Sequence, residues 1–508
     1  MSDEHVEIER KYDADAGFAV PDLDGLPGVA SVGEPERHEL HASYFDTAGL
    51  RLAAAKITLR RRKGGTDAGW HLKLPAADGN RLEIHAPLGS TNRPPKRLAD
   101  LVASVARGEP LRPVATLDTA RTTVLLLDEA GRPLAEIADD LVTGRDLRET
   151  SAVVFTPEDG AETGGADGAL RWREVEVELK GGSPDVLKAV GKRLKRAGAS
   201  RSGSASKLSR VLATEADTTR ADIAARAGRA DATAGDAVVA YIAAYLVRLL
   251  DHDPRARQDA DGAVHQMRTA ARRIRSALQS YESLFDAERT GPLKDGLKWL
   301  GGDVLGETRD LEVLRERFTG RLADLGEPEP AWTAALPRQQ AAAHRKAMRA
   351  LTSERYYELL DALDAFVTDP PFRKKARKPA ADVLPGLIQK SWWRLERKHA
   401  AITGADDADI ARHETRKAAK RARYAAELAE PVLGKPAKRA AKQAKRVQTV
   451  LGDYQDGVVA LERLHAVRPK TSGEAFATGA VYGVEHCRAG VAKQRLADLW
   501  TGLTVPIF

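Results

Sequence analysis

The stretch VEIERKY, residues 6–12, carries charges at alternate positions near the start of this 508-residue chain. Successive side chains of a β-strand point to opposite faces, so Glu7, Glu9 and Lys11 share one face of a strand. In most β-proteins, the residues that recur at every second position on one strand face are the apolar residues of the core. The pattern therefore predicts a strand whose charged face serves a purpose other than core packing.

Seven later segments show the same strand-like alternation and are bounded by turn residues. They are HASYFDT (41–47), KITLRRRK (56–63), WHLKLP (70–75), RLEIHAPL (81–88), RTTVLLLD (121–128), LAEIADDLV (134–142) and WREVEVELK (172–180). Helical patterns in this region occur mainly around 95–106 and 184–198. Residues 1–212 are therefore predicted to form an α+β domain dominated by eight antiparallel strands, arranged as a barrel or a sandwich.

The apolar period changes to that of helices from Asp236 onward. Residues 213–235 are small and polar and lack an apolar stripe, which predicts a linker. The helical part repeats itself: VHQMRTAARRIRSAL (264–278) aligns with RHETRKAAKRARYAA (412–426), and LGETRDLEVL (305–314) aligns with LGDYQDGVVAL (451–461). Residues 236–508 are therefore predicted to be all-α, with two copies of one unit at about 236–378 and 379–508.

The β-rich part and the helical part of the chain differ in net charge. The chain has a net charge of +7, but residues 1–219 sum to −4 and residues 220–508 sum to +11. The positive excess indicates a polyanionic partner for the helical part. The single cysteine, Cys487, excludes an internal disulfide and a cysteine-based zinc site. The N-terminus lacks a signal-peptide pattern and no apolar run could cross a bilayer, so a cytoplasmic location without a membrane partner is expected.

Charges at alternate positions recur along several of the predicted strands. The charged positions that share a strand face are Arg60 with Arg62, Arg81 with Glu83, and Glu174 with Glu176, Glu178 and Lys180. One such strand is usually just the solvated face of a sheet. Several such strands in a closed barrel favour a lumen lined by carboxylates and basic groups, which can hold a metal ion and a polyphosphate.

These segments resemble the CYTH family, the triphosphate tunnel metalloenzymes. EIERK (7–11) is similar to the family's ExExK signature, and the other matches follow in the family's order: YFDT (44–47), LRRR (59–62), LKLP (72–75), RLE (81–83), EVEVELKGG (174–182) and SK (206–207). The series covers nearly all of residues 1–212. The resemblance implies an eight-stranded antiparallel tunnel, whose members hydrolyse or rearrange triphosphates with Mg²⁺ or Mn²⁺.

The resemblance also assigns roles to individual residues. The implied metal-binding carboxylates are Glu7, Glu9, Glu174, Glu176, Glu178 and Asp140. Asp140 is preferred to Asp139 because strand alternation places it on the face of Glu136. The implied triphosphate-binding cations are Lys11, Arg60, Arg62, Lys73, Arg81, Arg121 and Lys207, and Glu83 and Glu136 would orient them. The implied chemistry is in-line attack of a metal-activated water on a terminal phosphoryl group, with inorganic triphosphate as the simplest substrate.

Basic side chains occupy matching positions in the two helical copies. They are His265, Arg268, Arg272 and Arg275 in the first copy, His413, Arg416, Lys420 and Arg423 in the second, and Lys438, Lys442 and Lys445 on a later helix. Their spacing places each set on one helix face. The repeated segments resemble the CHAD family, which has two four-helix bundles, commonly follows a CYTH domain and binds inorganic polyphosphate. The resemblance implies that these basic residues bind polyphosphate, whereas Asp310 and Asp456 are expected to be structural.

The sequence thus predicts a metal-dependent inorganic triphosphatase joined to a polyphosphate-binding module, with location at polyphosphate granules as a further expectation. Two other functions fit the same motifs: a non-catalytic adaptor that targets such granules, and a class IV type adenylate cyclase. Nucleic acid is the rival polyanion, but the basic helix faces lack clear aromatic platforms or a helix equipped to read base edges. Trp392 and Trp393 are expected to be core or interface residues.

Overall fold

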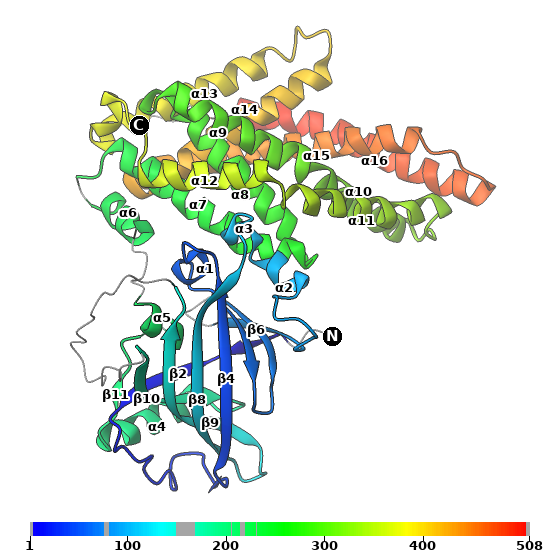
Figure 1. Cartoon of the computed structure of the whole chain (residues 1–508). Helices are drawn as coiled ribbons and strands as arrows, with labels where there is room; N and C mark the ends of the chain where they lie inside the picture. The colour runs from blue at the N-terminus through cyan, green and yellow to red at the C-terminus, as the bar shows by residue number, and fades with distance from the viewer. Residues whose placement is uncertain are drawn as a thin grey trace. The chain divides into compact units, whose positions relative to one another are not determined.

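The computed structural model describes residues 4–75, 81–148, 168–204, 206–213, 219–229 and 231–503 of the chain (Figure 1). For residues 4–7 the description covers the backbone alone. The chain divides into two compact units, Met1–Asp217 and Thr218–Phe508. All described strands lie in the first unit, whereas the described elements of the second unit are helices.

One antiparallel sheet forms the first unit. Its strands are β1 (Glu4–Glu7), β2 (Glu9–Ala14), β3 (Ser31–Val32), β4 (Glu36–Asp46), β5 (Thr58–Lys63), β6 (Gly69–Pro75), β7 (Arg81–Ala86), β8 (Arg112–Leu127), β9 (Pro133–Asp146), β10 (Leu170–Leu179) and β11 (Ser200–Arg201). All eight predicted segments form strands, which confirms the β-dominated fold. The strand count is higher than eight because the first segment divides at Ile8 and because β3 and β11 are two-residue strands.

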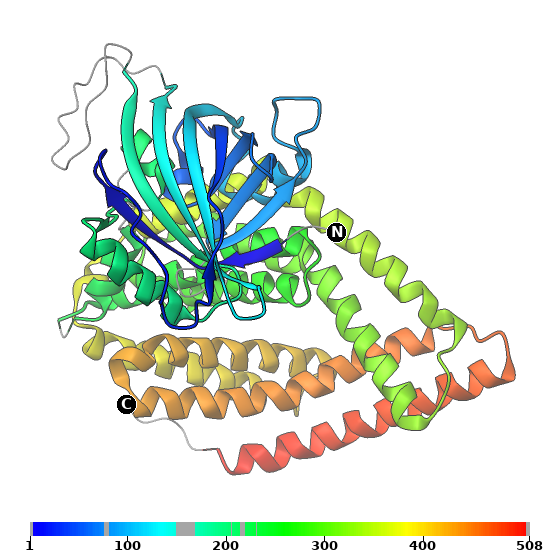
Figure 2. The same ribbon diagram turned by 90° about the horizontal axis from the view of Figure 1, so that it is seen from below.

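The opening segment joins the two sides of this sheet. The hydrogen-bonded order is β1-β7-β6-β5-β4-β8-β9-β10-β2-β11, and β3 pairs with β8 beside this path. β1 therefore pairs with β7, whereas β2, which follows after Ile8 alone, pairs with β10. Within the described residues no ladder joins β1 to β2, so the chain itself, rather than strand pairing, links the two sides. Figure 2 shows the strands curving around a common interior.

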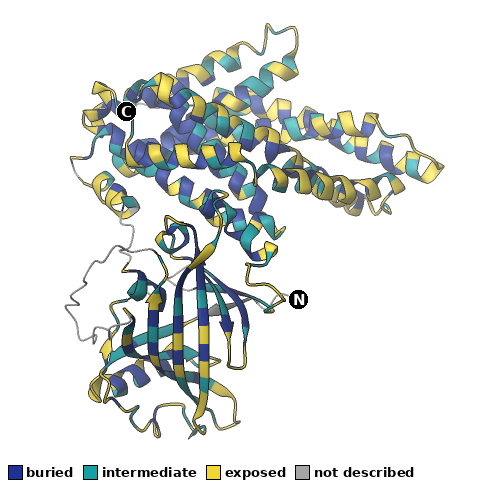
Figure 3. Ribbon diagram, in the orientation of Figure 1, coloured by how far each residue is buried: buried dark blue, intermediate teal, exposed yellow. Residues whose placement is uncertain are grey.

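The main apolar clusters of the first unit lie on the sheet face opposite to the charged residues. Short helices accompany the sheet: α1 (Arg51–Ala54), α2 (Lys96–Leu101), α3 (Ala103–Ala106), α4 (Pro184–Arg196) and α5 (Lys207–Leu212). Val175 and Val177 of β10 are buried against α4, and Leu59 and Leu72 are buried against α2 and α3. Figure 3 shows the resulting alternation of burial along the strands. Because helices cover the apolar outer face, the charged face lines the interior.

One end of the inner face is apolar and is covered by helix α5. Leu117 and Val142 of the sheet belong to the same buried cluster as Leu208 and Leu212 of α5. The helix begins with a capping box, in which the Ser206 hydroxyl accepts a hydrogen bond from the Ser209 backbone N–H at 3.1 Å. This packing places Lys207, the first residue of α5, beside the charged part of the inner face.

The close approach of α5 depends on Gly144 in β9. A Cβ atom at this position would lie 2.3 Å from Val211 Cγ2 and 3.2 Å from the Trp172 ring. We expect Gly144→Ala to lower the free energy of unfolding by about 1–3 kcal/mol, because α5 or the sheet must shift to make room. Chemical denaturation measures this loss. Gly203→Ala is the control, since a Cβ there meets no atom of the described residues within 4 Å; equal losses in both variants would contradict the packing argument.

The second unit consists of helices. They are α6 (Thr219–Ala227), α7 (Ala234–Arg257), α8 (Ala263–Ser280), α9 (Ala287–Lys298), α10 (Gly306–Leu325), α11 (Ala335–Ala350), α12 (Glu354–Thr368), α13 (Ala380–Ala400), α14 (Ala408–Leu433), α15 (Lys435–His465) and α16 (Ser472–Thr501), with a π-helical segment at Trp299–Val304 and short 3₁₀ turns. The all-α prediction is confirmed. The largest apolar cluster combines α7, α8, α9, α12 and α13 with parts of α14 and α15, so both predicted copies contribute to one core.

Two details differ from the sequence prediction. The segment 213–235, predicted as a linker, contains helix α6, whose Ile223 is buried in the helical core. Ile223 is the one large apolar residue in that helix, which is too little to produce an apolar stripe. Trp392 is buried as expected, but Trp393 is 55% exposed. No helix within the described ranges is long and apolar enough to span a membrane.

Candidate functional site

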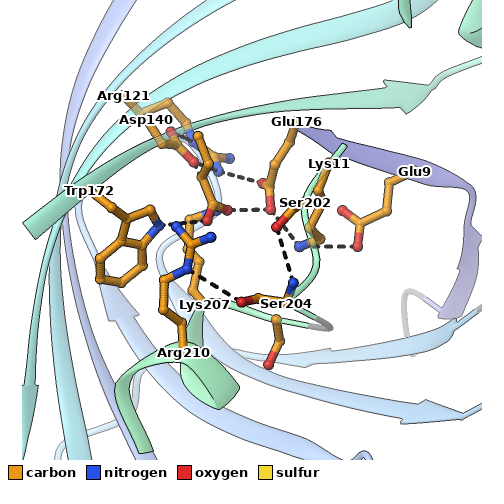
Figure 4. Close-up of polar contacts among 12 residues, drawn as sticks. Glu9, Lys11, Arg121, Asp140, Trp172, Glu176, Ser202, Ser204, Lys207 and Arg210 are labelled. Atoms are coloured by element: carbon orange, nitrogen blue, oxygen red, sulfur yellow. Dashed lines mark hydrogen bonds and ion pairs between the residues drawn. The ribbon is translucent and has the colours of Figure 1, made fainter. Parts of the chain in front are cut away.

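Charged side chains from four strands meet on the inner face of the sheet (Figure 4). Lys11 of β2 is paired with Glu176 of β10. In the next two ladders, Asp140 of β9 is paired with both Glu174 of β10 and Arg121 of β8. Directly paired residues of antiparallel strands have neighbouring side chains on one face. The strand register therefore gathers the charges that the period-two pattern predicted to share a face.

The Lys207 ammonium group lies among three of these carboxylates. Its Nζ atom is 2.6 Å from Glu174 Oε1, 2.8 Å from Glu176 Oε1 and 2.9 Å from Asp140 Oδ2. Asp140 is fully buried, and Glu174 and Lys207 are also buried. Burial by itself would lower the pKa of Lys207, but the three carboxylates outweigh burial and raise this pKa well above its usual value.

Two further cations complete the network. Arg121 donates to both oxygens of Asp140, from Nε at 2.7 Å and from Nη2 at 2.6 Å, and Nη2 also donates to Glu176 Oε2 at 2.9 Å. Lys11 Nζ lies 2.6 Å from Glu176 Oε1 and 3.3 Å from Glu9 Oε1. Burial would raise the pKa of Glu176, but its cationic neighbours outweigh burial and hold that pKa well below its usual range. Glu176 is therefore an anion at neutral pH.

Asp140, Glu174 and Glu176 could hold a metal ion. One ligand oxygen from each residue lies within 4.8 Å of the others. Trp172 fixes part of this geometry, because its Nε1 donates to Glu174 Oε2 at 2.7 Å while Oε1 contacts Lys207. Carboxylate oxygens are hard ligands of the kind that divalent cations such as Mg²⁺ and Mn²⁺ prefer. The donor set therefore fits a divalent cation.

A cavity of about 160 Å³ lies beside this cluster. The predicted site residues that line it are Lys11, Arg60, Arg62, Lys73, Arg81, Arg121 and Lys207, together with Glu83, Glu136, Glu176 and Glu178. All the predicted triphosphate-binding cations thus surround one space. Tyr44 is the single aromatic residue among the described lining residues. Arg61 does not line the cavity, since it pairs with Trp70 on the opposite face from Arg60.

Glu83 contacts a predicted cation through one of its oxygens and a histidine through the other. Its Oε2 lies 3.7 Å from Lys73 Nζ, and its Oε1 lies 2.8 Å from His71 Nδ1. Burial would raise the pKa of Glu83, but the hydrogen bond to His71 and the nearby positive charges lower it. Burial lowers the pKa of His71 to about 4. Glu136 instead lies 3.9 Å from Lys180.

Two of the predicted metal ligands, Glu9 and Glu178, lie outside the three-carboxylate cluster. Glu9 contacts Lys11, and Glu178 Oε2 lies 2.9 Å from Lys180 Nζ. The backbone of Glu7 is paired with Arg81 in the β1–β7 ladder, and its side chain lies outside the described residues. The remaining predicted ligands, Asp140 among them, form the cluster. Asp139 points to the other face, where it binds Arg173 at 2.6 Å.

In the helical unit, basic residues of the two copies face one another between α8 and α14. Arg268 and Arg272 lie on α8, and Arg416 and Lys420 lie on α14; we call these four residues the basic cluster. Burial, followed by the charges of the three arginines, lowers the pKa of Lys420 to about 7. Burial and the charges of Arg268 and Arg416 also lower the pKa of Arg272. Such mutual effects require the four cations to lie close together.

Matching acids support the basic cluster in both copies. Arg268 Nη1 lies 3.0 Å from Asp310 Oδ1, and Arg416 Nη2 lies 3.4 Å from Asp456 Oδ1. Each acid therefore contacts a basic neighbour, which agrees with the structural role expected for both. Within the described residues, neither Arg272 nor Lys420 forms an ion pair with an acid. The cluster therefore retains unbalanced positive charge.

The other predicted polyphosphate-binding residues lie beside the basic cluster or farther away. Burial and the charges of Arg309, Arg272 and Arg268 lower the pKa of His265, which is therefore near the cluster. His413 Nδ1 lies 3.2 Å from Gln455 Oε1. Arg423 donates to Glu427 at 2.6 Å. The remaining residues of the set are the half-buried Arg275 and the exposed Lys438, Lys442 and Lys445 of α15.

Three supporting residues escaped prediction. His71 and Trp172 lie two positions before Lys73 and Glu174 on their strands, so strand alternation was an available signal for both. Arg273 Nη1 lies 2.9 Å from the Tyr241 hydroxyl and 2.5 Å from Glu427 Oε2, which ties α8 to α7 and α14. No sequence pattern distinguishes this arginine from its neighbours.

Comparison with known proteins places the chain in a family. Residues 5–212 match the CYTH domain and residues 240–465 match the CHAD domain. The uncharacterized protein Rv2226 of Mycobacterium tuberculosis is 36% identical over 512 residues, which cover 97% of this chain and 95% of the relative. The fold and the two matches define a two-domain protein, in which an antiparallel β-sheet unit is followed by an all-helical unit. The chain belongs to the family that joins a CYTH domain to a CHAD domain, as its motifs indicated.

Two solved structures show more limited similarity. The CHAD domain from the plant Ricinus communis is 26% identical with a TM-score of 0.44, covering 55% of this chain and 95% of that chain. The adenylyl cyclase candidate HpAC1 from Hippeastrum, for which a dominant triphosphatase activity is described, is 18% identical with a TM-score of 0.23. That match covers 41% of this chain and 95% of HpAC1.

Proposed function

We propose that the first unit is an inorganic triphosphatase that hydrolyses tripolyphosphate with Mg²⁺ or Mn²⁺. One observation carries this proposal: three clustered carboxylates adjoin a cavity that is lined by the predicted cations. Carboxylates alone suit a metal ion, and basic groups alone suit an anion. Both together suit a divalent metal ion bound to a polyphosphate.

The crowding of positive charge in the cavity favours an anionic ligand. Burial and the charges of Arg60 and Arg121 lower the pKa of Arg62 to about 9. A polyphosphate held between these side chains relieves their mutual repulsion and forms charge-assisted hydrogen bonds with them. With Tyr44 as the one aromatic lining residue described, the cavity offers little surface for stacking a nucleobase.

The residues of the site divide into three roles. Asp140, Glu174 and Glu176 would hold the metal ion, which supplies charge neutralisation and a more acidic bound water. Arg60, Arg62, Lys73 and the other lining cations hold the phosphate oxygens in place. Glu83 fixes Lys73, and Trp172 fixes Glu174. Catalysis then rests on positioning and on electrostatic stabilisation of the transferred phosphoryl group.

A substrate panel tests this proposal. Phosphate release is measured for pyrophosphate, tripolyphosphate, ATP, thiamine triphosphate and long-chain polyphosphate, each with Mg²⁺ and with Mn²⁺. We expect the highest kcat/KM with tripolyphosphate. Tight binding of tripolyphosphate without turnover under either metal would instead identify an adaptor, and formation of cyclic AMP from ATP would identify a cyclase.

We also propose that the helical unit binds inorganic polyphosphate through the basic cluster. The supporting observation is that both copies contribute to this cluster and that neither Arg272 nor Lys420 forms an ion pair with an acid among the described residues. A flexible chain with about one charge per phosphate can follow such a surface and release counterions as it binds. The affinity should therefore fall steeply as salt is raised.

Lys420 should make polyphosphate binding depend on pH. Its pKa of about 7 is lowered from the usual lysine value, so roughly half of the free protein carries a neutral Lys420 at pH 7. A bound polyanion favours the charged form, so binding takes up a proton and the affinity falls as pH rises from 6 to 8. We expect uptake of about half a proton per site at pH 7.

Titration calorimetry in two buffers of different ionisation enthalpy measures this uptake. Lys420→Met should lower the uptake at pH 7 by about half a proton, whereas Lys442→Met on the exposed face of α15 should leave it unchanged. Equal proton uptake by wild type and Lys420→Met would show that a residue other than Lys420 takes up the proton.

A further inference from the structure

We propose that Lys207 is a tethered internal cation that occupies the metal position of the metal-free protein and leaves it when a divalent ion binds. This role rests on the metal site proposed above. Family resemblance implies only that Lys207 binds phosphate. We infer in addition that the Lys207 side chain has two positions: one among the carboxylates before the metal ion binds, and one at the phosphate afterwards.

The geometry places Lys207 where a metal ion would be bound. Its Nζ atom lies within 2.9 Å of one oxygen from each carboxylate of the candidate metal cluster. An ammonium group and a divalent ion repel strongly at such distances in a buried site. The three carboxylates therefore cannot hold both cations in this arrangement.

The surroundings of Lys207 allow its side chain to move without moving the helix. Helix α5 is anchored by its Ser206 cap and by Leu208 and Leu212 in the apolar cluster. Lys207 itself lines the cavity, so its ammonium group can turn on a flexible four-carbon stem toward the space assigned to phosphate. Asp140 remains paired with Arg121, and Glu176 remains paired with Lys11 and Arg121.

Competition by Lys207 has a measurable consequence. Since the ammonium group must leave before a metal ion binds, the apparent metal affinity of the wild type is reduced by the fraction of protein that has the site open. Lys207→Met removes the competitor and leaves the three carboxylates with a net negative excess. We expect this variant of the full chain to bind Mn²⁺ at least about tenfold more tightly than wild type.

The test is Mn²⁺ titration followed by electron paramagnetic resonance, with no phosphate present. Lys180→Met is the matched control: Lys180 lines the same cavity but contacts Glu178 and Glu136 rather than the cluster, so its Mn²⁺ affinity should equal that of wild type. The double variant Asp140→Asn with Lys207→Met should lose the tight site, which identifies the cluster as its location.

Thermal unfolding with and without Mn²⁺ provides a second readout. Without metal, Lys207→Met should melt at a lower temperature than wild type, because three carboxylates, two of them buried, have lost a shared partner. Saturating Mn²⁺ should restore its melting temperature, even if the metal-free variant does not fold. Failure of Mn²⁺ to restore folding contradicts the proposal, as does a folded Lys207→Met that binds Mn²⁺ no more tightly than wild type. Absence of Mn²⁺ binding by every variant would contradict the proposed metal site itself.

Discussion

Asp140→Asn is expected to lower kcat/KM for tripolyphosphate by roughly 100-fold or more with either Mg²⁺ or Mn²⁺. Asp140 is fully buried, belongs to the three-carboxylate cluster and accepts two hydrogen bonds from Arg121. An amide in its place is a weaker metal ligand and leaves Lys207 and Arg121 with one anion fewer. Steady-state phosphate release over a range of substrate and metal concentrations measures the loss.

Asp139→Asn is the matched control for this variant. Asp139 precedes Asp140 in the same strand, but it lies on the outer face and binds Arg173. Its replacement removes the same charge from the same strand, and kcat/KM should stay within about threefold of wild type. Because loss of a buried ion-pair partner can cost about 3–5 kcal/mol, thermal unfolding must show that Asp140→Asn is folded at the assay temperature. Similar activities for the two variants would exclude Asp140 from the site.

Replacing all four residues of the basic cluster by Ala is expected to weaken binding of long-chain polyphosphate by at least about 100-fold at moderate salt. The basic cluster combines residues of both copies: Arg268 and Arg272 from the first, and Arg416 and Lys420 from the second. The quadruple variant therefore removes one site that both copies form together. The slope of log K against log salt should also become shallower, because fewer counterions are released on binding. Binding titrations at several salt concentrations measure both effects.

A second quadruple variant controls for net charge. Arg345 and Arg349 on α11 and Arg488 and Arg495 on α16 are exposed, and their replacement by Ala removes the same four charges. This variant should bind polyphosphate within about fivefold of wild type. If the two quadruple variants lose affinity equally, general attraction by the positive domain, rather than the basic cluster, accounts for binding. Stronger binding of RNA or DNA than of polyphosphate by wild type would also contradict the proposal.

Strand alternation allowed much of the first unit to be predicted, because it is a local property of the backbone. Lys11 of VEIERKY does line the interior cavity, and Glu9 contacts it from the same strand face. The same rule distinguished Asp140 from Asp139. Division of the opening segment at Ile8 was not predictable, since it depends on pairing with β7 on one side and β10 on the other.

Contacts that depend on packing between distant elements escaped prediction. Lys207 reaches the carboxylates only because α5 packs on an apolar end of the inner face, and Gly144 permits that approach. Its position in the sequence, next to Ser206, contains no such information. The repeat in the helical part predicted matching Arg268 and Arg416 with their acids. Repetition alone could not show that the two basic faces meet, because that depends on how α8 packs against α14.

We propose above all that the charged interior of the sheet, to which VEIERKY contributes Lys11, is a metal-dependent triphosphate site. Its most direct test is phosphate release from tripolyphosphate by the full chain, with Mn²⁺ or Mg²⁺ and again with EDTA in excess. The structure-based proposal predicts steady turnover with metal and none with EDTA. Saturable binding of tripolyphosphate with no phosphate release under either metal would contradict it.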